Sequence, residues 1–591
     1  MYDQIYDPIR HSLGLSTIFA VLPLLTVFVL LAVFKVRAQW AALIALAVSI
    51  IVAIVVYSMP VGQTFSAAGE GAVFGLFPIM WIVVNAIWVY TMTVTTGHFD
   101  VLRRSFGTVS SDQRIQAIII AFCFGALLEA LAGFGTPVAI TSVMLLALGF
   151  SKIKAASVAL VANTAPVAYG AIAVPITTLA KITNLPEHDI ASTVGRQTPV
   201  LALIVPLALV FMVDGKRGIK QTWPVALLAG VVFGLLQFLC SNYISIPLTD
   251  IVASLGSALA IVIFLRVWQP SEVLHVDALS EEDVKSHLSA ATESAHAVEL
   301  GGSRGTGRRS GRTAEGSTAG RAASAAGGAT SVSGASGLTD AAGPDSRSDI
   351  FKAYAPYLII IVVFSVAQIG FIAKLLAKGA TKFTWPGLDI QTPAGKSPSA
   401  VTFAFGWLPA GGTLLLISGI ITMLVLGLGP ITALRDYLKT LDQLKWAIVT
   451  VAGVLALAYV MNLSGQTITI GKWMAGAGAA FAFLSPILGW LGVAVTGSDT
   501  SSNALFGTLQ TSAAQSAHLP PVLMASANSS GGVLGKMISP QNLAIAAAAV
   551  GLAGDEGVIL RKVLGWTLGF LLFMCVLVYL QSTSVLSWML P

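Results

Sequence analysis

Long uncharged, apolar runs recur along nearly the whole chain of 591 residues, among them Phe74–Thr95, Ala155–Ala180 and Thr402–Leu428. A helix of about 20 apolar residues crosses the hydrocarbon core of a membrane. The runs are continuous, whereas the strands of a membrane barrel alternate between polar and apolar residues. The sequence therefore predicts an all-α polytopic membrane protein with about twelve spanning helices and two further hairpins that enter the membrane without crossing it.

The composition excludes several other classes of protein. Only 10% of the residues are charged, against about 25% in a soluble domain. The 33 Lys and Arg residues barely exceed the 27 Asp and Glu residues, so nucleic acid is not the expected partner. No His-Glu-x-x-His, Gly-x-Ser-x-Gly or zinc-ligand spacing occurs. We therefore expect no enzyme, no cofactor and no metal site, and membrane lipid as the surroundings.

One segment differs from the rest and divides the chain. Residues 269–349 hold 18 of the 60 charged residues, and their second half is rich in Gly, Ser, Ala and Arg. Such a composition cannot bury a core. It predicts a disordered cytoplasmic loop over 269–350 between a first membrane half, 1–268, and a second, 351–591. A tolerated linker is favoured over a regulatory tail.

The segment Ile115–Phe150 predicts the first hairpin. Arg114 and Lys152 flank it, and the positive-inside rule puts both flanks on the cytoplasmic side. Its return limb, Pro137–Phe150, has 14 residues and would rise only about 21 Å as a helix. We therefore predict a re-entrant hairpin over 115–150 rather than two full spans.

An internal repeat predicts a second hairpin over 473–514. The stretch from Gly125 to Pro137 matches the stretch from Gly489 to Ser501 at an offset of 364, and Ala162–Pro175 matches Ala527–Pro540 at 365. Seven predicted spans lead from Phe74–Thr95 to its equivalent, Trp446–Leu463, and an odd number inverts the topology. Each hairpin precedes a helix interrupted near Asn163 or Asn528. Inverted repeats with paired interruptions are typical of secondary transporters.

The residues at these breaks predict an anion site. Glycines permit a turn, a Thr can cap a helix, and Pro suits its first turn, while a helix N-terminus attracts anions. Tight helix packing is the alternative role for small residues in lipid. The predicted substrate-binding residues are Gly133, Gly135, Thr136 (as the N-cap), Pro137, Asn163, Thr164, Thr500, Ser501, Ser502, Asn503, Asn528, Ser529, Ser530 and Lys536.

Three charges at membrane depth are candidates for coupling. Asp499 lies in the second break, Glu129 lies one turn before the first, and Lys536 lies after Gly535 in the second interrupted helix. Charges inside a membrane are rare and usually functional. A carboxyl in a dry site can carry a proton near neutral pH, so Asp499 is the first candidate for proton coupling and Glu129 the second. Lys536 would pair with the substrate, or form a buried pair with Asp499 or Glu129.

These stretches also carry a resemblance. Gly133–Ile140, Ala162–Ala168, Thr496–Phe506 and Gly535–Gln541 resemble the bacterial lactate permease family, and the similarity extends over nearly the full chain. The resemblance implies a symporter of the cytoplasmic membrane that couples uptake of L-lactate to proton entry. It also implies D-lactate and glycolate as related substrates, and an ion-transporter-like fold with paired hairpins. The long loop within 269–350 departs from the family pattern.

The residues alone leave alternatives open. A sodium-coupled carrier of another small organic anion would suit the same breaks, because backbone carbonyls can hold Na⁺. An anion channel is disfavoured by the fixed acidic residues Glu129 and Asp499. The sequence does not fix the oligomeric state, and a homodimer is one option.

Overall fold

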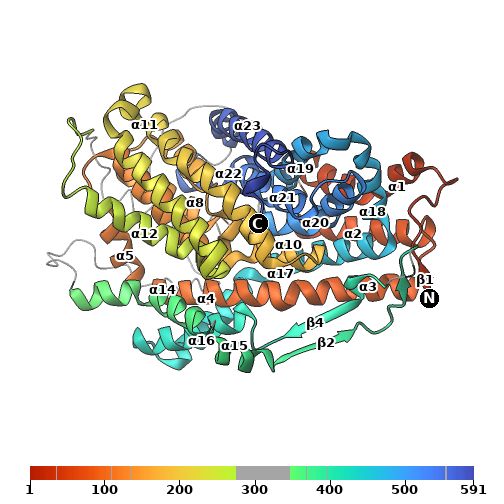
Figure 1. The fold of residues 1–591 in the computed structure, drawn as a ribbon. Coiled ribbons are helices and arrows are strands. Elements are labelled where there is room, and N and C mark those ends of the chain that lie inside the picture. The colour runs from red at the N-terminus through yellow and green to blue at the C-terminus, as the bar shows by residue number, and fades with distance from the viewer. Residues whose placement is uncertain are drawn as a thin grey trace, which may run out of the picture.

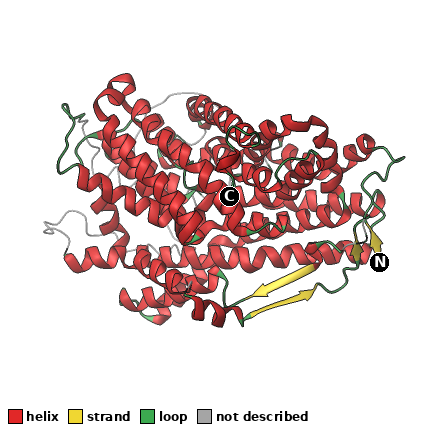
Figure 2. Ribbon diagram, in the orientation of Figure 1, coloured by secondary structure: helices red, strands yellow, loops and turns green. Residues whose placement is uncertain are grey.

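The computed structural model describes residues 1–34, 36–107, 109–132, 135–274, 346–367, 369–393, 395, 397–552 and 555–591. The described residues are mostly helical, with a few short strands along one edge (Figure 2). The helices of the first half are α1 (Leu13–Phe28), α2 (Ala38–Val55), α3 (Val61–Phe74), α4 (Trp81–Thr95), α5 (His98–Gly107), α6 (Gln113–Gln116), α7 (Gly125–Ala132), α8 (Thr136–Ala147), α9 (Lys152–Ala162), α10 (Gly170–Thr183), α11 (Glu187–Leu239) and α12 (Thr249–Phe264).

The second half repeats much of this order. Its helices are α14 (Arg347–Ala367), α15 (Gly370–Ala377), α16 (Gly411–Val425), α17 (Pro430–Ser464), α18 (Gln466–Met474), α19 (Phe481–Thr496), α20 (Asp499–Ser516), α21 (Pro521–Gly535), α22 (Pro540–Ala549) and α23 (Glu556–Gln581). The run from α19 to α23 corresponds in order to the run from α7 to α11. Both runs consist of a hairpin, a broken helix and a long helix.

The multi-span class predicted from the sequence is confirmed. Among the described residues, ten helical stretches are long and apolar enough to cross a membrane, or eleven if the bent pair α9 and α10 forms one span. This count treats Glu187–Ile244 as one stretch of 58 residues, which would be about 87 Å long at 1.5 Å per residue. The backbone leaves the helical conformation at Asp214 and Gly215, so the stretch supplies two spans. The number twelve stays a prediction.

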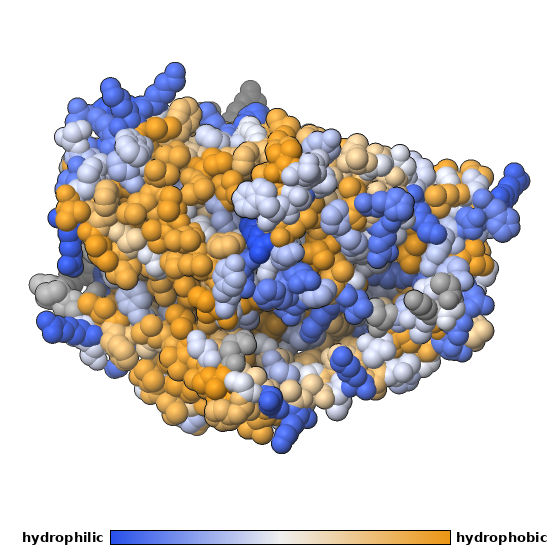
Figure 3. Space-filling model, viewed as in Figure 1, coloured by the Kyte–Doolittle hydropathy of each residue, from blue (hydrophilic) through white to orange (hydrophobic). Residues whose placement is uncertain are grey.

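The surface agrees with a membrane environment. Hydrophobic residues cover much of the face over α11 and α12, and hydrophilic residues gather toward the left and right edges of the view (Figure 3). Leu227, Leu235, Leu259 and Ile263 are among the large apolar side chains exposed on these two helices. An apolar surface of this extent would be unfavourable in water and is expected next to lipid.

The segment Val61–Thr95 and helix α17 show how the two halves of the chain are oriented relative to each other. They run side by side through the molecule (Figure 1). Gly71 lies against the backbone of Leu455, whereas Trp88, further along the first segment, donates its indole N–H to the carbonyl of Ala433 at 2.9 Å. Residue numbers rise along one segment as they fall along the other, so the pair is antiparallel. Because the repeat makes these segments equivalent, one half is inverted relative to the other.

Contacts between other equivalent helices are exchanged in the same way. Helix α2 packs on α17 and α16 packs on α4, while α1 packs on α18 and α14 packs on α5. Each contact thus joins a helix of one half to a helix of the other, and has a counterpart with the halves interchanged. The helices of the two halves are therefore interleaved rather than separate. We propose that 1–268 and 351–591 are two repeats within one fold.

A small β-structure was missed by the sequence analysis. Strands β2 (Ala380–Thr384) and β4 (Thr402–Gly406) form an antiparallel pair, and β1 (Tyr2–Asp3) pairs with β3 (Ile390–Gln391) in parallel. The predicted span Thr402–Leu428 was therefore wrong at its start, since the helix begins only at Gly411. The alternation Thr-Phe-Ala-Phe-Gly before Gly411 is typical of a strand with one buried face.

The predicted loop over 269–350 lies mostly outside the described residues. Its first residues are held to the body, because the backbone N–H of Leu274 donates to the Asp112 carboxylate at 3.2 Å. Its last residues belong to α14, which begins at Arg347. The expected disorder of 275–345 stays a prediction.

Candidate functional site

The two hairpins are packed against the opposite halves. Helix α20 of the second hairpin runs along α10, where the Asn503 amide donates to the carbonyl of Pro175 at 3.1 Å. Helix α8 of the first hairpin runs along α22, and Ala139, Val143, Ile545 and Ala549 form a small buried apolar cluster between them. Each return helix therefore joins the broken helix of the other half.

The tip of the first hairpin lies at the start of α22. Gly135 is the N-cap of α8 with φ of 88°, a conformation that glycine adopts without strain. A Cβ at Gly135 would collide with Ile545 and lie 3.3 Å from the Asn542 side chain. The expectation that Thr136 caps this helix was wrong, because the left-handed turn at Gly135 makes Thr136 its first residue. Gly133 lies outside the described residues.

The helix after this tip begins without a side-chain cap. Pro137 occupies its first turn, as predicted, and Pro137 and Gly135 contribute no side-chain acceptor there. The first N–H groups of a helix without such a cap are available to an anion. The return limb α8 has 12 residues, about 18 Å, which agrees with a hairpin that does not cross the membrane.

Glu129 forms a buried ion pair across the two halves. It lies on α7, and its Oε1 is 2.6 Å from the Nζ of Lys536. The Asn163 amide donates to Oε2 at 3.0 Å. The side chains of Glu129 and Lys536 are only 4% and 7% exposed. Of the two pairings that the sequence left open for Lys536, the structure has the one with Glu129.

The tip of the second hairpin lies beside that of the first. Gly497 ends α19 with φ of 77°, and the Ser498 hydroxyl accepts from the backbone N–H of Ser501 as the cap of α20. A Cβ at Gly497 would lie 2.5 Å from Oε1 of Gln541. Gln541 neighbours Asn542, which contacts the first tip. Both tips therefore reach the first turn of α22.

The Asp499 carboxylate accepts hydrogen bonds from neutral side chains. Ser529 donates to Oδ2 at 2.6 Å and Asn503 donates to the same oxygen at 3.3 Å. The other oxygen, Oδ1, is buried with no hydrogen-bond partner among the described residues. It lies against Gly532, where a Cβ would overlap it. Lys536 is close enough to interact electrostatically with this carboxylate.

A chain of amides and hydroxyls extends from Asp499. The Asn528 amide donates to Oδ1 of Asn503 at 2.8 Å, and the Gln510 amide donates to Oδ1 of Asn528 at 3.2 Å. Ser485 donates to Gln510 at 2.8 Å. This network lies between α19, α20 and α21 and orients Asn503 toward Asp499.

One predicted interruption was wrong. The first broken helix does end at Asn163, which is the C-cap of α9, and its two parts are bent by 62°. The second continues through Asn528 to Gly535 and breaks at Lys536–Ser539. Asn528 satisfies its side chain within the network, whereas Ser539 caps α22 and Pro540 occupies its first turn. The cap and the proline fix the break, which begins eight residues after Asn528.

Three of the remaining predicted residues make hydrogen bonds within the protein. Thr164 donates to the carbonyl of Val161 at 2.8 Å, and Ser502 donates to Gly489 at 3.2 Å. Ser530 donates to Gln197 of α11 at 2.5 Å. Thr500 lies half-buried in the first turn of α20. Thr164 thus bonds to backbone within its own turn, whereas Ser502 joins the two limbs of its hairpin.

A buried charge within a predicted span was not selected from the sequence. Asp250 on α12 is 1% exposed, and Gln237 of α11 donates to its Oδ1 at 3.2 Å. The same Gln237 amide donates to the carbonyl of Ala165, in the break of the first broken helix. The rule that charges at membrane depth are functional candidates would have selected Asp250, which lies in a predicted span.

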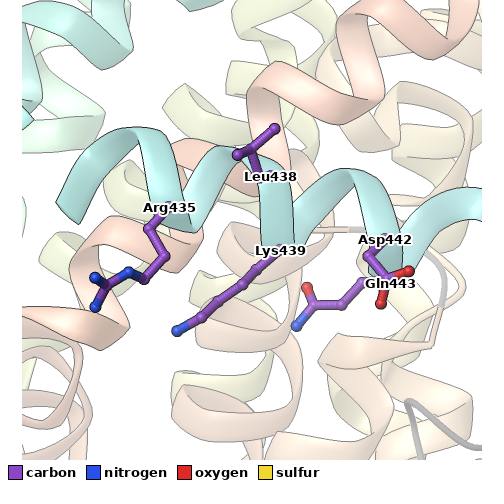
Figure 4. A pocket seen from close by; sticks show the side chains of 5 residues that line it. All are labelled: Arg435, Leu438, Lys439, Asp442 and Gln443. Carbon is purple, nitrogen blue, oxygen red and sulfur yellow. The ribbon is translucent and has the colours of Figure 1, made fainter. Parts of the chain in front are cut away.

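The clearest surface hollow lies elsewhere. It is formed by successive turns of α17 and is lined by Arg435, Leu438, Lys439, Asp442 and Gln443 (Figure 4). All five belong to one helix, and none is a predicted site residue. A hollow along one exposed helix face offers no enclosed binding site.

Comparison with known proteins agrees with this arrangement. The profile of the L-lactate permease family matches residues 16–300 and 329–585. The glycolate permease GlcA of Escherichia coli is 39% identical over 98% of both chains. The L-lactate permeases of Bacillus subtilis and E. coli are each 37% identical over the full length of both chains.

A solved structure, that of the antimetabolite efflux pump MtrF of Neisseria gonorrhoeae, aligns over 97% of this chain and 95% of its own. The TM-score is 0.43 and the identity 13%, values too low to support an argument about function. The full-length relatives and the apolar helices identify a multi-pass protein of the bacterial plasma membrane. Paired hairpins, broken helices and full-length similarity lead to one conclusion: the chain belongs to the L-lactate permease family.

Proposed function

We propose that this protein is a secondary active transporter that takes up L-lactate together with protons, and that D-lactate and glycolate are further substrates. The names of the relatives supply the substrate class. The observation that carries the proposal is the buried Lys536 ammonium, which lies where a hairpin of one half meets the broken helix of the other.

The site suits a small hydroxylated carboxylate. Lys536 supplies one fixed positive charge, and the start of α8 supplies backbone N–H groups without a side-chain cap. The hydroxyls and amides around Asp499, those of Ser529 and Asn503, can exchange hydrogen bonds with a 2-hydroxyl group. A single buried cation suits a monoanion better than a polyanion.

Accumulation of an anion requires a compensating cation. Carboxylic acids of this kind have pKa values of about 4, so lactate is ionised at pH 7. One elementary charge moved against 100 mV costs about 2.3 kcal/mol. A proton bound by a buried carboxyl group and carried with lactate removes this cost. Asp499 and Glu129 are the two carboxyl groups proposed to carry it, and both are buried beside Lys536.

Proteoliposomes with an imposed pH gradient test the function. We expect labelled lactate to accumulate when the outside is acidic, with the same rate in the presence and absence of Na⁺, and to be displaced by unlabelled D-lactate and glycolate. Sodium dependence at fixed pH would instead identify a sodium-coupled carrier. Uptake that equilibrates but never accumulates would identify a channel.

Variants test the coupling. Asp499→Asn and Glu129→Gln keep the size and hydrogen-bonding reach of the side chains but cannot release a proton. At least one should lose accumulation under a pH gradient and retain lactate exchange, because exchange requires no net proton movement. If both variants accumulate lactate normally, the proton is carried elsewhere.

A further inference from the structure

The ion pair between Glu129 and Lys536 occupies the charge that a substrate anion would need. Lys536 Nζ donates to Glu129 Oε1 at 2.6 Å, and Glu129 is its only hydrogen-bond acceptor among the described residues. Both side chains are more than nine-tenths buried. A carboxylate of the protein therefore already occupies the position at the ammonium that a lactate carboxylate would take.

The pair lies in a site with an excess of carboxyl groups. Asp250 on α12 interacts electrostatically with Glu129, and Asp499 on α20 interacts with Lys536. The other titratable or charged groups on the elements packed against the pair are Tyr90, Cys123, Lys152, Lys154, Lys181, Glu556, Arg561, Lys562, Cys575 and Tyr579. Lys536 thus interacts with two buried carboxyl groups, those of Glu129 and Asp499, and Glu129 also interacts with Asp250. A substrate anion at Lys536 would add a further negative charge to a site in which carboxyl groups already outnumber this cation.

An unpaired negative charge in such a place is strongly unfavourable. Breaking a buried ion pair by removal of one partner is strongly destabilising, because the other charge stays buried. If a lactate carboxylate took Lys536, Glu129 would be that uncompensated charge. Binding of one proton to Glu129 removes the charge and leaves a neutral carboxyl group. The carbonyl oxygen of that group can still accept a hydrogen bond from the Asn163 amide.

We propose that the substrate carboxylate and Glu129 compete for Lys536, and that Glu129 takes up the coupled proton when the substrate displaces it. The exchange is balanced: lactate anion, one proton and the Lys536–Glu129 ion pair give a Lys536–lactate ion pair and a neutral Glu129 carboxyl. Nothing else is consumed or released. The inference rests on the proposed function and assigns the proton to Glu129 rather than Asp499.

The same competition accounts for release. When the proton leaves Glu129 on the side of higher pH, the carboxylate competes again for the ammonium and expels the substrate. In the empty protein, Glu129 therefore takes the place of the substrate carboxylate at Lys536. The ammonium stays paired while the transporter changes its conformation without substrate. Because Glu129 is the competing group, a variant that lacks its charge should bind the substrate anion more tightly than the wild type, rather than more weakly.

Binding measured on the purified full-length protein tests this. Isothermal titration with L-lactate between pH 5.5 and 8 should show a wild-type dissociation constant that rises by up to about tenfold per pH unit, as linkage to one proton requires. Titrations in buffers of different ionisation enthalpy should report uptake of about one proton per lactate at the higher pH. Uptake of no proton by the wild type would overturn the proposal without any variant.

Three variants separate the alternatives. Glu129→Gln should bind lactate with an affinity independent of pH and, at pH 8, at least tenfold tighter than the wild type. Lys536→Gln should lose binding. Glu70→Gln is the matched control, since Glu70 is a buried carboxyl group on α3 outside the proposed site, and it should keep the pH dependence. If Glu129→Gln keeps the pH dependence and Asp499→Asn loses it, the proton belongs to Asp499 and the proposal is wrong.

The outcomes also distinguish this inference from the proposed function. A folded wild-type protein that binds no lactate, D-lactate or glycolate would contradict the proposed function itself. A protein that binds lactate and accumulates it under a pH gradient, yet takes up no proton on binding, would leave the function intact and contradict only the competition.

Discussion

The two hairpins are built alike and carry different charges. In the first, Glu129 precedes the tip and is paired with a cation of the other half, at 2.6 Å from Lys536. In the second, Asp499 follows the tip, and the side chains that donate hydrogen bonds to its carboxylate are the neutral Ser529 and Asn503. The offset of the repeat aligns Glu129 with Val493 and Asp499 with Gly135. The order of the helices is therefore repeated, whereas the charges are not.

This difference indicates what each part contributes. Two inverted copies give two broken helices and two tips that meet, which is what access from either side of a membrane requires. A transporter for one anion needs only one cation at the meeting point. Under the proposed function, the asymmetry of Glu129, Lys536 and Asp499 would adapt an inverted repeat to a substrate that carries one charge.

The largest effect is expected at Lys536. Lys536→Gln leaves Glu129 buried without its cation, which should destabilise the protein by about 3–5 kcal/mol and abolish lactate uptake. The double variant Glu129→Gln, Lys536→Gln replaces the ion pair by two amides and should regain most of the stability but no uptake. Thermal unfolding in detergent and proteoliposome uptake measure the two effects. If the single and double variants are equally stable, the ion pair is not the reason for the loss.

Two glycines test the space around the two carboxylates. Gly170 gives room to Glu129, since a Cβ there would lie 2.8 Å from Oε1, and Gly532 gives room to Asp499, whose Oδ1 a Cβ would overlap. Gly170→Ala and Gly532→Ala should each lower the uptake rate by at least tenfold, with the greater loss at Gly532. Gly569→Ala, where nothing lies within 4 Å of the added Cβ, is the matched control and should transport normally. Equal rates in all three variants would mean that the position of the carboxylates is not critical.

A smaller effect is expected for the partner of Asp499. Ser529→Ala removes one hydrogen bond to the carboxylate, and a bond to a charged group contributes about 1.5–3 kcal/mol. The protein should remain folded, with a midpoint of unfolding above that of Lys536→Gln, and retain part of its uptake. A loss of stability as great as that of Lys536→Gln would remove the distinction drawn between the two hairpins.

The smallest effect is expected at the connection between the halves. Replacement of residues 279–343 by a short flexible linker should leave the lactate uptake rate within twofold of the wild type. The reason is that exchanged contacts such as α2 with α17 and α16 with α4 hold the halves together without it. Uptake normalised to the amount of protein in the membrane measures this. A variant that reaches the membrane and folds but does not transport would give the segment a function.

Much of the fold could be predicted because a segment that crosses lipid must be a long apolar helix. Apolar runs gave the helices, and glycines at Gly135 and Gly497 marked the two tips, both of which have positive φ. Helix α17 was predicted only from Trp446, although it begins at Pro430. Its first turns carry Arg435, Lys439 and Asp442. Because these residues are charged, hydropathy alone predicts a loop there instead of a helix.

The site was predicted less completely, because pairing depends on distance in space. The sequence indicated that Glu129, Asp499 and Lys536 matter, but not which carboxylate would bind the lysine. Asn528 was expected at a break because it aligns with Asn163, yet its amide is used by Asn503, and the break forms where Ser539 caps a new helix. The repeat preserves residue types at positions where the three-dimensional surroundings have diverged.

The crossed packing of the hairpins has a mechanical consequence. Helix α20 is bonded to α10 through Asn503 and Pro175, and α8 is packed along α22. A displacement of one broken helix is therefore expected to carry the opposite hairpin with it. For the proposed transporter, we expect α8, α10, α20 and α22 to move as one unit against α3, α4 and α17 when the protein opens toward either side of the membrane, rather than the two hairpins moving independently.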